Sequence, residues 1–106
     1  MFGLLKNLFS SEPDTFLVQA IQDGALLVDV RSPSEFASGS VKGAVNIPLD
    51  TMPNQLAKFK GRKSVVVFCR SGARSSQAKG FLDQQGIPNV FNGGTWNNVQ
   101  QLLKAS

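Results

Sequence analysis

Residues 64–76 read SVVVFCRSGARSS, and the interpretation of the whole chain depends on this stretch. Its first part, residues 64–68, is an apolar run of three valines followed by phenylalanine. Such a β-branched run is typical of a strand in the middle of a parallel sheet that is covered on both faces. A polar loop begins at Cys69, and a helix is predicted over residues 75–85. Ligands bind at the carboxyl ends of strands in such sheets, which is where Cys69 stands.

Strand and helix patterns alternate along the rest of the chain. Further strands are predicted over residues 25–30, 44–47 and 89–91, and helices over residues 14–22, 50–59 and 95–104, with a short helical turn at 32–36. The alternation predicts an α/β fold with a mostly parallel central sheet of about four or five strands, flanked by helices on both faces. We expect Asp50 to cap its helix, and Gly93 and Gly94 to turn the chain before the last helix.

The chain has 106 residues, 42% of them hydrophobic and 17% charged, which is the composition of one globular domain. A linker-like stretch at residues 10–13 separates an N-terminal segment, residues 1–12, from the main domain, residues 13–106. Residues 1–9 have an amphipathic helical pattern without the features of a signal peptide. Packing on the domain, or a frayed start, is favoured over contact with a membrane, because one lysine adds little electrostatic attraction.

The sequence contains a single cysteine and no histidine. The lack of histidine excludes Ser-His-Asp triads, Cys-His dyads and HExxH zinc motifs. A single cysteine excludes a disulfide within the chain and a four-cysteine zinc site, and no metal site is expected. The lone thiol suits a reducing compartment, so we expect a cytoplasmic protein.

The formal net charge of +4 suits an anionic ligand. The basic residues are scattered, and the one close run, at residues 58–63, favours a solvated helix end and loop over a nucleic-acid surface. We therefore expect no nucleic-acid partner. A domain of this size without a spare apolar stripe is expected to be a monomer.

The loop that starts at Cys69 has the features of an anion-binding cup. Gly72 can adopt positive φ and curl the loop, so that backbone N–H groups point inward. The next helix adds the positive end of its dipole, and Arg70 and Arg74 add charge. The same field lowers the pKa of a thiol, so a nucleophilic thiolate can form without histidine. The alternative is a buried, inert cysteine beside exposed arginines, and the clustering of these features within six positions argues against it.

Three stretches resemble the rhodanese homology domain, in particular the stand-alone single-domain rhodaneses. The first is DVRSPSEF at residues 29–36, continuing through Gly39, Gly43, Ala44, Asn46, Ile47 and Pro48. The second is CRSGARS at residues 69–75, and the third is VFNGG at residues 90–94, followed by Trp96. Two departures stand out: Ser40 occupies a position where the signatures often have histidine, and Trp96 follows the double glycine unusually closely.

The resemblance implies a thiosulfate sulfurtransferase that needs no metal or organic cofactor. Cys69 would take the outer sulfur of a donor such as thiosulfate, become a persulfide and pass the sulfur to cyanide in the assay, or to a thiol or a protein in the cell. The loop would bind the donor and the persulfide through Arg70, Ser71, Gly72, Ala73, Arg74 and Ser75. Arg31 and Trp96 are candidates for the pocket rim, although ion pairing for Arg31 and core packing for Trp96 are also open. Ser75 is equally a candidate helix cap.

Other functions are weighed against this one. Look-alike phosphatases need five residues between the cysteine and an arginine, whereas Arg74 follows Cys69 after four. The main rival is a sulfur-carrier or interaction module that delivers persulfide sulfur to one protein partner. A second rival function is a scaffold that is tethered to a membrane through residues 1–9. Asp29 and Glu35 are expected to be structural, with Glu35 holding the turn at residues 32–36 through backbone N–H groups.

Overall fold

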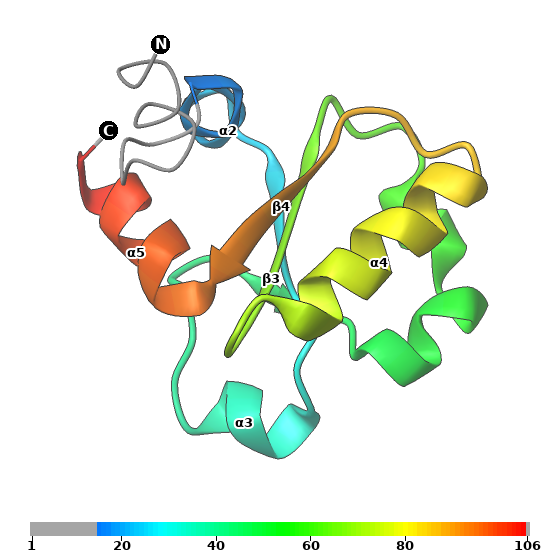
Figure 1. Cartoon of the computed structure of the whole chain (residues 1–106), viewed down its shortest axis with the longest axis horizontal. Coiled ribbons are helices and arrows are strands. Elements are labelled where there is room, and N and C mark those ends of the chain that lie inside the picture. Colours follow the sequence, from blue (N-terminus) through cyan, green and yellow to red (C-terminus); the bar gives the residue numbers. More distant parts are fainter. Residues whose placement is uncertain (1–14, 106) are drawn as a thin grey trace, which may run out of the picture.

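The sheet has four strands, all parallel, in the order β2-β1-β3-β4 (Figure 1). The computed structural model describes residues 15–105. The strands are β1 (Leu26–Asp29), β2 (Val45–Asn46), β3 (Val65–Cys69) and β4 (Val90–Thr95). The predicted α/β fold with a mostly parallel sheet is therefore confirmed.

Helices cover both faces of this sheet. Figure 1 shows α2 (Thr15–Gln22) and α5 (Trp96–Ala105) on one side and α4 (Ala73–Gln84) on the other. The short helix α3 (Pro33–Ala37) follows β1, and two 3-10 helices, η1 (Leu49–Asn54) and η2 (Leu56–Phe59), connect β2 to β3. Among residues 15–105, no helix has the length and apolar character needed to cross a membrane.

Strand β3 lies at the centre of the core, as its valine run predicts. All five of its residues have no exposed surface. Val65, Val67 and Cys69 pack in one cluster with Ala78 and Leu82 of α4. The intervening residues, Val66 and Phe68, pack in a second cluster with Leu17 of α2 and Val99 of α5. The alternation of side chains along a strand therefore divides β3 between the two cores.

The helix predicted over residues 50–59 is wrong as a single element. The chain there forms η1 and η2, which are separated at Gln55, whose φ of −128° and ψ of 24° are not helical. Pro53 lies inside η1 and supplies no backbone N–H, which is the physical reason an α-helix does not continue through it. The first cap position is Pro48 and has no side-chain capping bond, so the expected capping role of Asp50 is also wrong.

The double glycine does not turn the chain. Gly93 and Gly94 both lie in β4, where Val67 pairs with Asn92 but Phe68 pairs with Gly94. The extra residue, Gly93, is a β-bulge, and Gly94 accommodates it with a φ of +78°. The strand thus continues to Thr95, and α5 begins immediately after it.

The N-terminal segment, residues 1–12, lies outside the described residues together with Asp14, the predicted start of the first helix. The division into an N-terminal segment and a main domain remains a prediction. The predicted helix over residues 14–22 agrees with α2 from Thr15 onward.

We predict that Gly93→Ala destabilises the domain. A Cβ at position 93 would come within 2.5 Å of Val99 Cγ2 and 3.0 Å of Val66 Cγ1, so the overpacked core should lose about 1–3 kcal/mol of unfolding free energy. Gly80→Ala is the matched control, because a Cβ on this exposed face of α4 meets nothing within 4 Å. The control should gain about 0.5–1 kcal/mol from helix propensity. Urea unfolding of both variants measures the difference, and equal stabilities would contradict the packing at the bulge.

Candidate active site

The loop between β3 and α4 is shaped by one glycine. Cys69 is the last residue of β3, and α4 begins at Ala73. Gly72 stands between them with a φ of +96°, in the left-handed region that residues with a Cβ rarely adopt. This conformation folds the loop back over the end of β3. The loop lies close to the bulge of β4, because a Cβ on Gly72 would be 3.8 Å from Gly94 Cα.

Two backbone N–H groups converge on the sulfur of Cys69. The Gly72 N–H donates to Sγ at 3.0 Å, and the Ser75 N–H donates at 3.4 Å. Ser75 lies in the first turn of α4, so its N–H belongs to the positive end of the helix dipole. The predicted cup of inward-pointing N–H groups is therefore present around Sγ.

Ser75 contributes its hydroxyl as well as its N–H. The side chain is fully buried, and its Oγ lies 3.5 Å from Cys69 Sγ and 3.1 Å from the Gly72 carbonyl oxygen, to which it donates. Gly94 O is also 3.5 Å away. The cap position of α4 is Gly72, so Ser75 is not the helix cap. Its single proton can instead turn toward a thiolate on Cys69.

These contacts lower the pKa of the Cys69 thiol below its ordinary value. Burial of the sulfur is the largest influence and acts in the opposite direction, because it disfavours the charged form. It is outweighed by hydrogen bonds from the Ser75 hydroxyl and from the N–H groups of Ser75, Gly72 and Ser71. A thiolate is thus stabilised here by amides and a hydroxyl, without histidine.

Arg74 is bound to a carboxylate from another part of the chain. Its two terminal nitrogens donate to the two oxygens of Glu35 at 2.7 and 3.0 Å, in a bidentate ion pair between α4 and α3. The bonds from Arg74, with a further one from the Ser32 N–H, lower the pKa of Glu35 to about 2. Glu35 also completes the expected turn, where Ser32 and Glu35 form a reciprocal capping box.

Three other loop residues are directed toward solvent. Arg70, Ser71 and Ala73 are exposed. Within residues 15–105, the Arg70 guanidinium makes no hydrogen bond or ion pair with another residue. Of the two loop arginines, Arg70 is therefore the one whose charge is not balanced by a carboxylate.

Arg31 belongs to a buried network of hydrogen bonds at the end of β1. Its guanidinium forms an ion pair with Asp29 at 2.7 Å and donates to the Gly39 carbonyl oxygen at 2.6 Å. The Ser40 hydroxyl donates to the same Asp29 oxygen at 2.6 Å. Trp96 covers the pair, with its ring centre 5.3 Å from the Arg31 guanidinium carbon, a cation–π contact. Arg31 is 5% exposed and Asp29 is fully buried, so the pair joins the end of β1 to the chain before β2.

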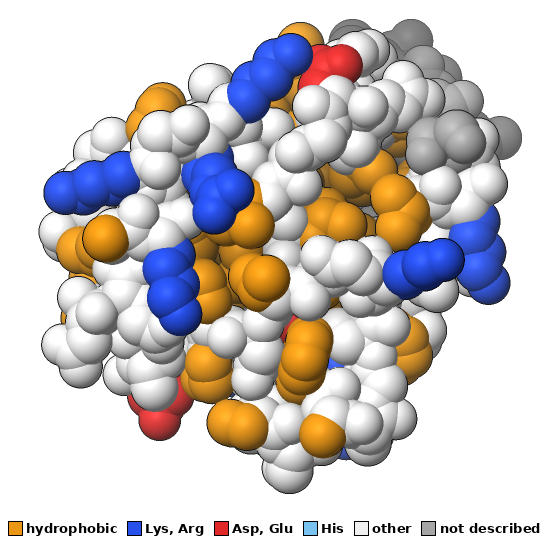
Figure 2. Space-filling view, turned by 180° about the vertical axis from the view of Figure 1, so that it is seen from behind, with side chains coloured by type: hydrophobic (Ala, Val, Ile, Leu, Met, Phe, Trp, Pro, Cys, Tyr) orange, Lys and Arg blue, Asp and Glu red, His pale blue; other side chains and the backbone are white. Residues whose placement is uncertain are grey.

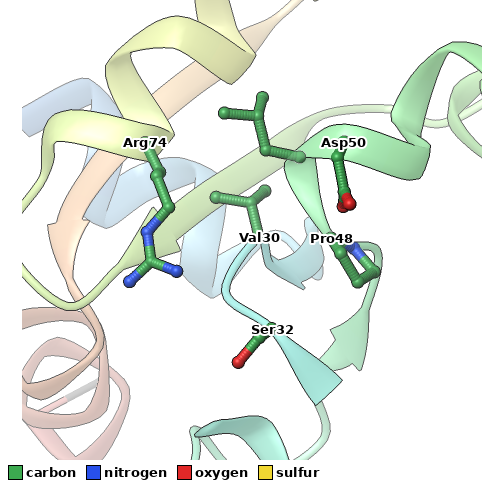
Figure 3. A pocket seen from close by; sticks show the side chains of 6 residues that line it. Val30, Ser32, Pro48, Asp50 and Arg74 are labelled. Carbon is green, nitrogen blue, oxygen red and sulfur yellow. The ribbon is translucent and has the colours of Figure 1, made fainter. Parts of the chain in front are cut away.

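A pocket of about 370 Å³ lies beside the first turn of α4 (Figure 3). Its lining residues come from the segment after β1, from the start of η1 and from α4: Val30, Ser32, Pro48, Leu49, Asp50 and Arg74. Figure 3 shows Arg74 on one side of Val30, with Asp50 and Pro48 on the other. Arg31 and Trp96, the residues expected at a pocket rim, are not among its lining residues.

The basic side chains are dispersed over the surface. Figure 2 shows one face, on which Lys and Arg side chains lie on both halves, around exposed apolar side chains, with an acidic side chain beside one of them. The absence of a nucleic-acid partner remains a prediction.

Comparison with known proteins matches residues 14–99 to the rhodanese-like domain family. The chain belongs to the rhodanese-like domain family. It is 41% identical over 70 residues to a sulfurtransferase of Allochromatium vinosum, a match that covers 66% of this chain and 65% of that protein. The identity with thiosulfate sulfurtransferase PspE of Escherichia coli is 38% over 74 residues, covering 68% of this chain and 71% of PspE.

The solved structure of a rhodanese with anions from E. coli resembles the chain with a TM-score of 0.65 and 34% identity, covering 71% of this chain and 91% of that one. Rhodanese-like segments also occur in larger proteins: the match to a tRNA uridine(34) hydroxylase of Pelagibacter ubique covers 28% of that protein. Membership in the family therefore supports sulfur transfer as the class of reaction, but it does not identify the donor or the acceptor.

The rhodanese-like signatures predicted the Cys69 loop but missed several contacts around it. The Ser-x-x-Glu pattern at residues 32–35 is a capping-box signal that could have placed Glu35 at a helix start. No local pattern could have paired Glu35 with Arg74, 39 positions away. Ser40, the departure from the usual histidine, acts here by donating to Asp29. Asp50 was assigned to a cap and instead lines the pocket.

We predict that Ser75→Ala raises the pKa of Cys69, because it removes the hydroxyl but keeps the backbone N–H. Thiolate absorbance in the ultraviolet measures this pKa as pH is raised, and the signal is clean because the chain has one cysteine and no tyrosine. The thiolate should appear at lower pH in the wild type than in the variant. Ser71→Ala is the control, since only its backbone N–H stabilises the thiolate. If the titration curve of Ser75→Ala is the same as that of the wild type, the Ser75 hydroxyl does not stabilise the thiolate.

Proposed function

We propose that this rhodanese-like chain is a sulfurtransferase that moves the outer sulfur of thiosulfate to a thiophilic acceptor through a persulfide on Cys69. The observation that carries the proposal is the convergence of the Gly72 and Ser75 N–H groups on Cys69 Sγ, at 3.0 and 3.4 Å. These donors stabilise negative charge on sulfur both before and after transfer. The names of relatives such as PspE support thiosulfate as the donor.

In the first half-reaction, the Cys69 thiolate attacks the outer sulfur of thiosulfate. A new S–S bond forms at Sγ, the S–S bond of thiosulfate breaks, and sulfite leaves with the electron pair. The negative charge that was on Sγ of the Cys69 thiolate then lies on the outer sulfur of the persulfide. No proton is transferred, so the absence of histidine from the sequence is no obstacle.

In the second half-reaction, a nucleophile attacks the outer sulfur of the persulfide. With cyanide, a C–S bond forms, the persulfide S–S bond breaks, and thiocyanate leaves. The electron pair returns to Sγ as thiolate, which the loop N–H groups and the Ser75 hydroxyl stabilise again. The same donors thus serve the resting enzyme and the leaving group.

The loop arginines contribute unequally to binding the donor dianion. Arg70 is exposed, has no carboxylate partner among residues 15–105 and attracts anions to the loop. The charge of Arg74 is balanced by Glu35, which with a pKa of about 2 remains ionised at all working pH values. The backbone N–H groups of the cup therefore supply the main contact with bound thiosulfate.

We predict that Cys69→Ser abolishes thiocyanate formation from thiosulfate and cyanide, because the hydroxyl is neither ionised nor able to carry sulfane sulfur. Wild-type and variant chains are compared in the same assay, with circular dichroism to confirm that both are folded. Mass spectrometry of wild type after thiosulfate treatment should show the mass of one added sulfur.

Lys79→Ala is the control variant, because it changes an exposed residue of α4 whose partner is Asp83. Thiocyanate formation by folded Cys69→Ser would overturn the mechanism. Failure of the folded wild type to take sulfur from thiosulfate would overturn the choice of donor.

We predict that Arg74→Ala raises KM for thiosulfate on the order of tenfold, more than Arg70→Ala, because it also leaves the Glu35 carboxylate unpaired beside the anion. The double variant Glu35→Gln/Arg74→Ala should recover part of this loss. Glutamine keeps the capping-box geometry while removing the charge. Steady-state kinetics with thiosulfate measures all three variants. A double variant no better than Arg74→Ala would show that the guanidinium itself contacts the donor.

A further inference from the structure

Two residues that line the pocket beside α4, Val30 and Arg74, are close neighbours of the Cys69 site. Val30, on its wall, donates its N–H to the carbonyl oxygen of Phe68, the residue before Cys69, at 3.0 Å. Val30 also packs in the same core cluster as Cys69. Arg74, which also lines the pocket, directly precedes Ser75, whose N–H contacts Sγ. The pocket therefore lies on the same face of the sheet as the Cys69 side chain and beside the turn of α4 that contacts Sγ.

The charge of the pocket does not favour an anion. Arg74 is the only cation among its lining residues, and it is already paired with Glu35. The Asp50 carboxylate, by contrast, makes no hydrogen bond or ion pair with any residue in the described range 15–105. The Arg74 guanidinium and the carboxylates of Glu35 and Asp50 together carry one net negative charge. Three of the other lining residues, Val30, Pro48 and Leu49, are apolar, and Figure 3 shows Val30 between Arg74 and Asp50.

An aliphatic group with a protonated amine complements such a pocket. The carbon chain would lie against Val30, Pro48 and Leu49, and the ammonium would bind the Asp50 carboxylate. The volume of about 370 Å³ is within the range of small-molecule sites. Thiosulfate, a dianion, gains nothing from Asp50. The pocket is therefore better suited to the sulfur acceptor than to the donor.

We propose that this pocket is the acceptor site and that it selects small aliphatic thiols carrying an ammonium group, with Asp50 as the residue that determines this specificity. The inference rests on the proposed function, because it requires the persulfide on Cys69. The acceptor thiolate attacks the outer sulfur, a new S–S bond forms, the bond to Sγ breaks, and its electron pair returns to Cys69. The products are the acceptor persulfide and the Cys69 thiolate, and the thiol proton goes to water.

The ammonium also has an electrostatic role in the reaction. An attacking thiolate and a persulfide are both anions and repel each other. A positive charge on the attacking molecule, held at Asp50, reduces this repulsion as the two sulfurs approach. A neutral thiol of the same length lacks this help.

The test compares cysteamine with N-acetylcysteamine, its uncharged counterpart, as acceptors for thiosulfate-loaded protein. We predict that Asp50→Asn lowers kcat/KM for cysteamine by about threefold to tenfold and does not lower it for N-acetylcysteamine. For each thiol, the kcat/KM of the variant is divided by that of the wild type. This ratio does not depend on the intrinsic reactivity of the thiol. Asp83→Asn is the matched control, because it removes a carboxylate at the far end of α4 and should change neither rate.

The outcomes separate the two proposals. Equal changes with both thiols, or no change with cysteamine, would overturn the acceptor site while thiocyanate formation continued. Failure of wild type to load sulfur on Cys69 would overturn the proposed function, and the acceptor site with it. Because the Asp50 side chain has no partner in the described fold, Asp50→Asn should unfold at the wild-type urea concentration.

Discussion

The burial of β3 on both faces is the constraint on which the rest of the structure depends. Its residues alternate between the α4 side and the α2/α5 side, so this strand holds the two cores in register. It also pairs with β1 on one edge and β4 on the other, which leaves no freedom in where it ends. Cys69 is the last residue of this immobilised strand. The sulfur is therefore placed by a fully buried strand, and only the short loop that follows has to supply the donors around it.

The sequence was sufficient to predict this centre because the information there is local. A run of valines indicates a covered strand, and the segment from Cys69 to Ser75 has the glycine, the arginines and the helix start that an anion cup needs. The bulge at Gly93 was missed for a different reason. Two glycines in a row suggest a turn, and only the crowding by Val66 and Val99 shows why a strand needs a residue without Cβ there. Pro53 was a local signal against a continuous helix over residues 50–59, but the prediction followed the apparent helical pattern instead.

The contacts that surround the cup could not be predicted, because they join residues distant in the chain. Glu35 comes from the turn after β1 and Arg74 from the start of α4, and nothing in either segment specifies the other. Parallel strands bring these segments together, since their carboxyl ends meet at one edge of the sheet. The same geometry places Asp50 across from Arg74. The family resemblance predicted the loop around Cys69, whereas the charges near it are brought together only when this edge of the sheet is assembled.

In the proposed mechanism, the single cysteine limits this chain to one bound sulfur atom. A sulfur atom held at position 69 has no second thiol within these 106 residues that could displace it by closing a disulfide. In this mechanism the persulfide sulfur can leave only when another molecule reaches it. Discharge is consequently a second-order event whose rate is set by the concentration of the acceptor outside. Each molecule also counts as one equivalent in any titration of bound sulfur.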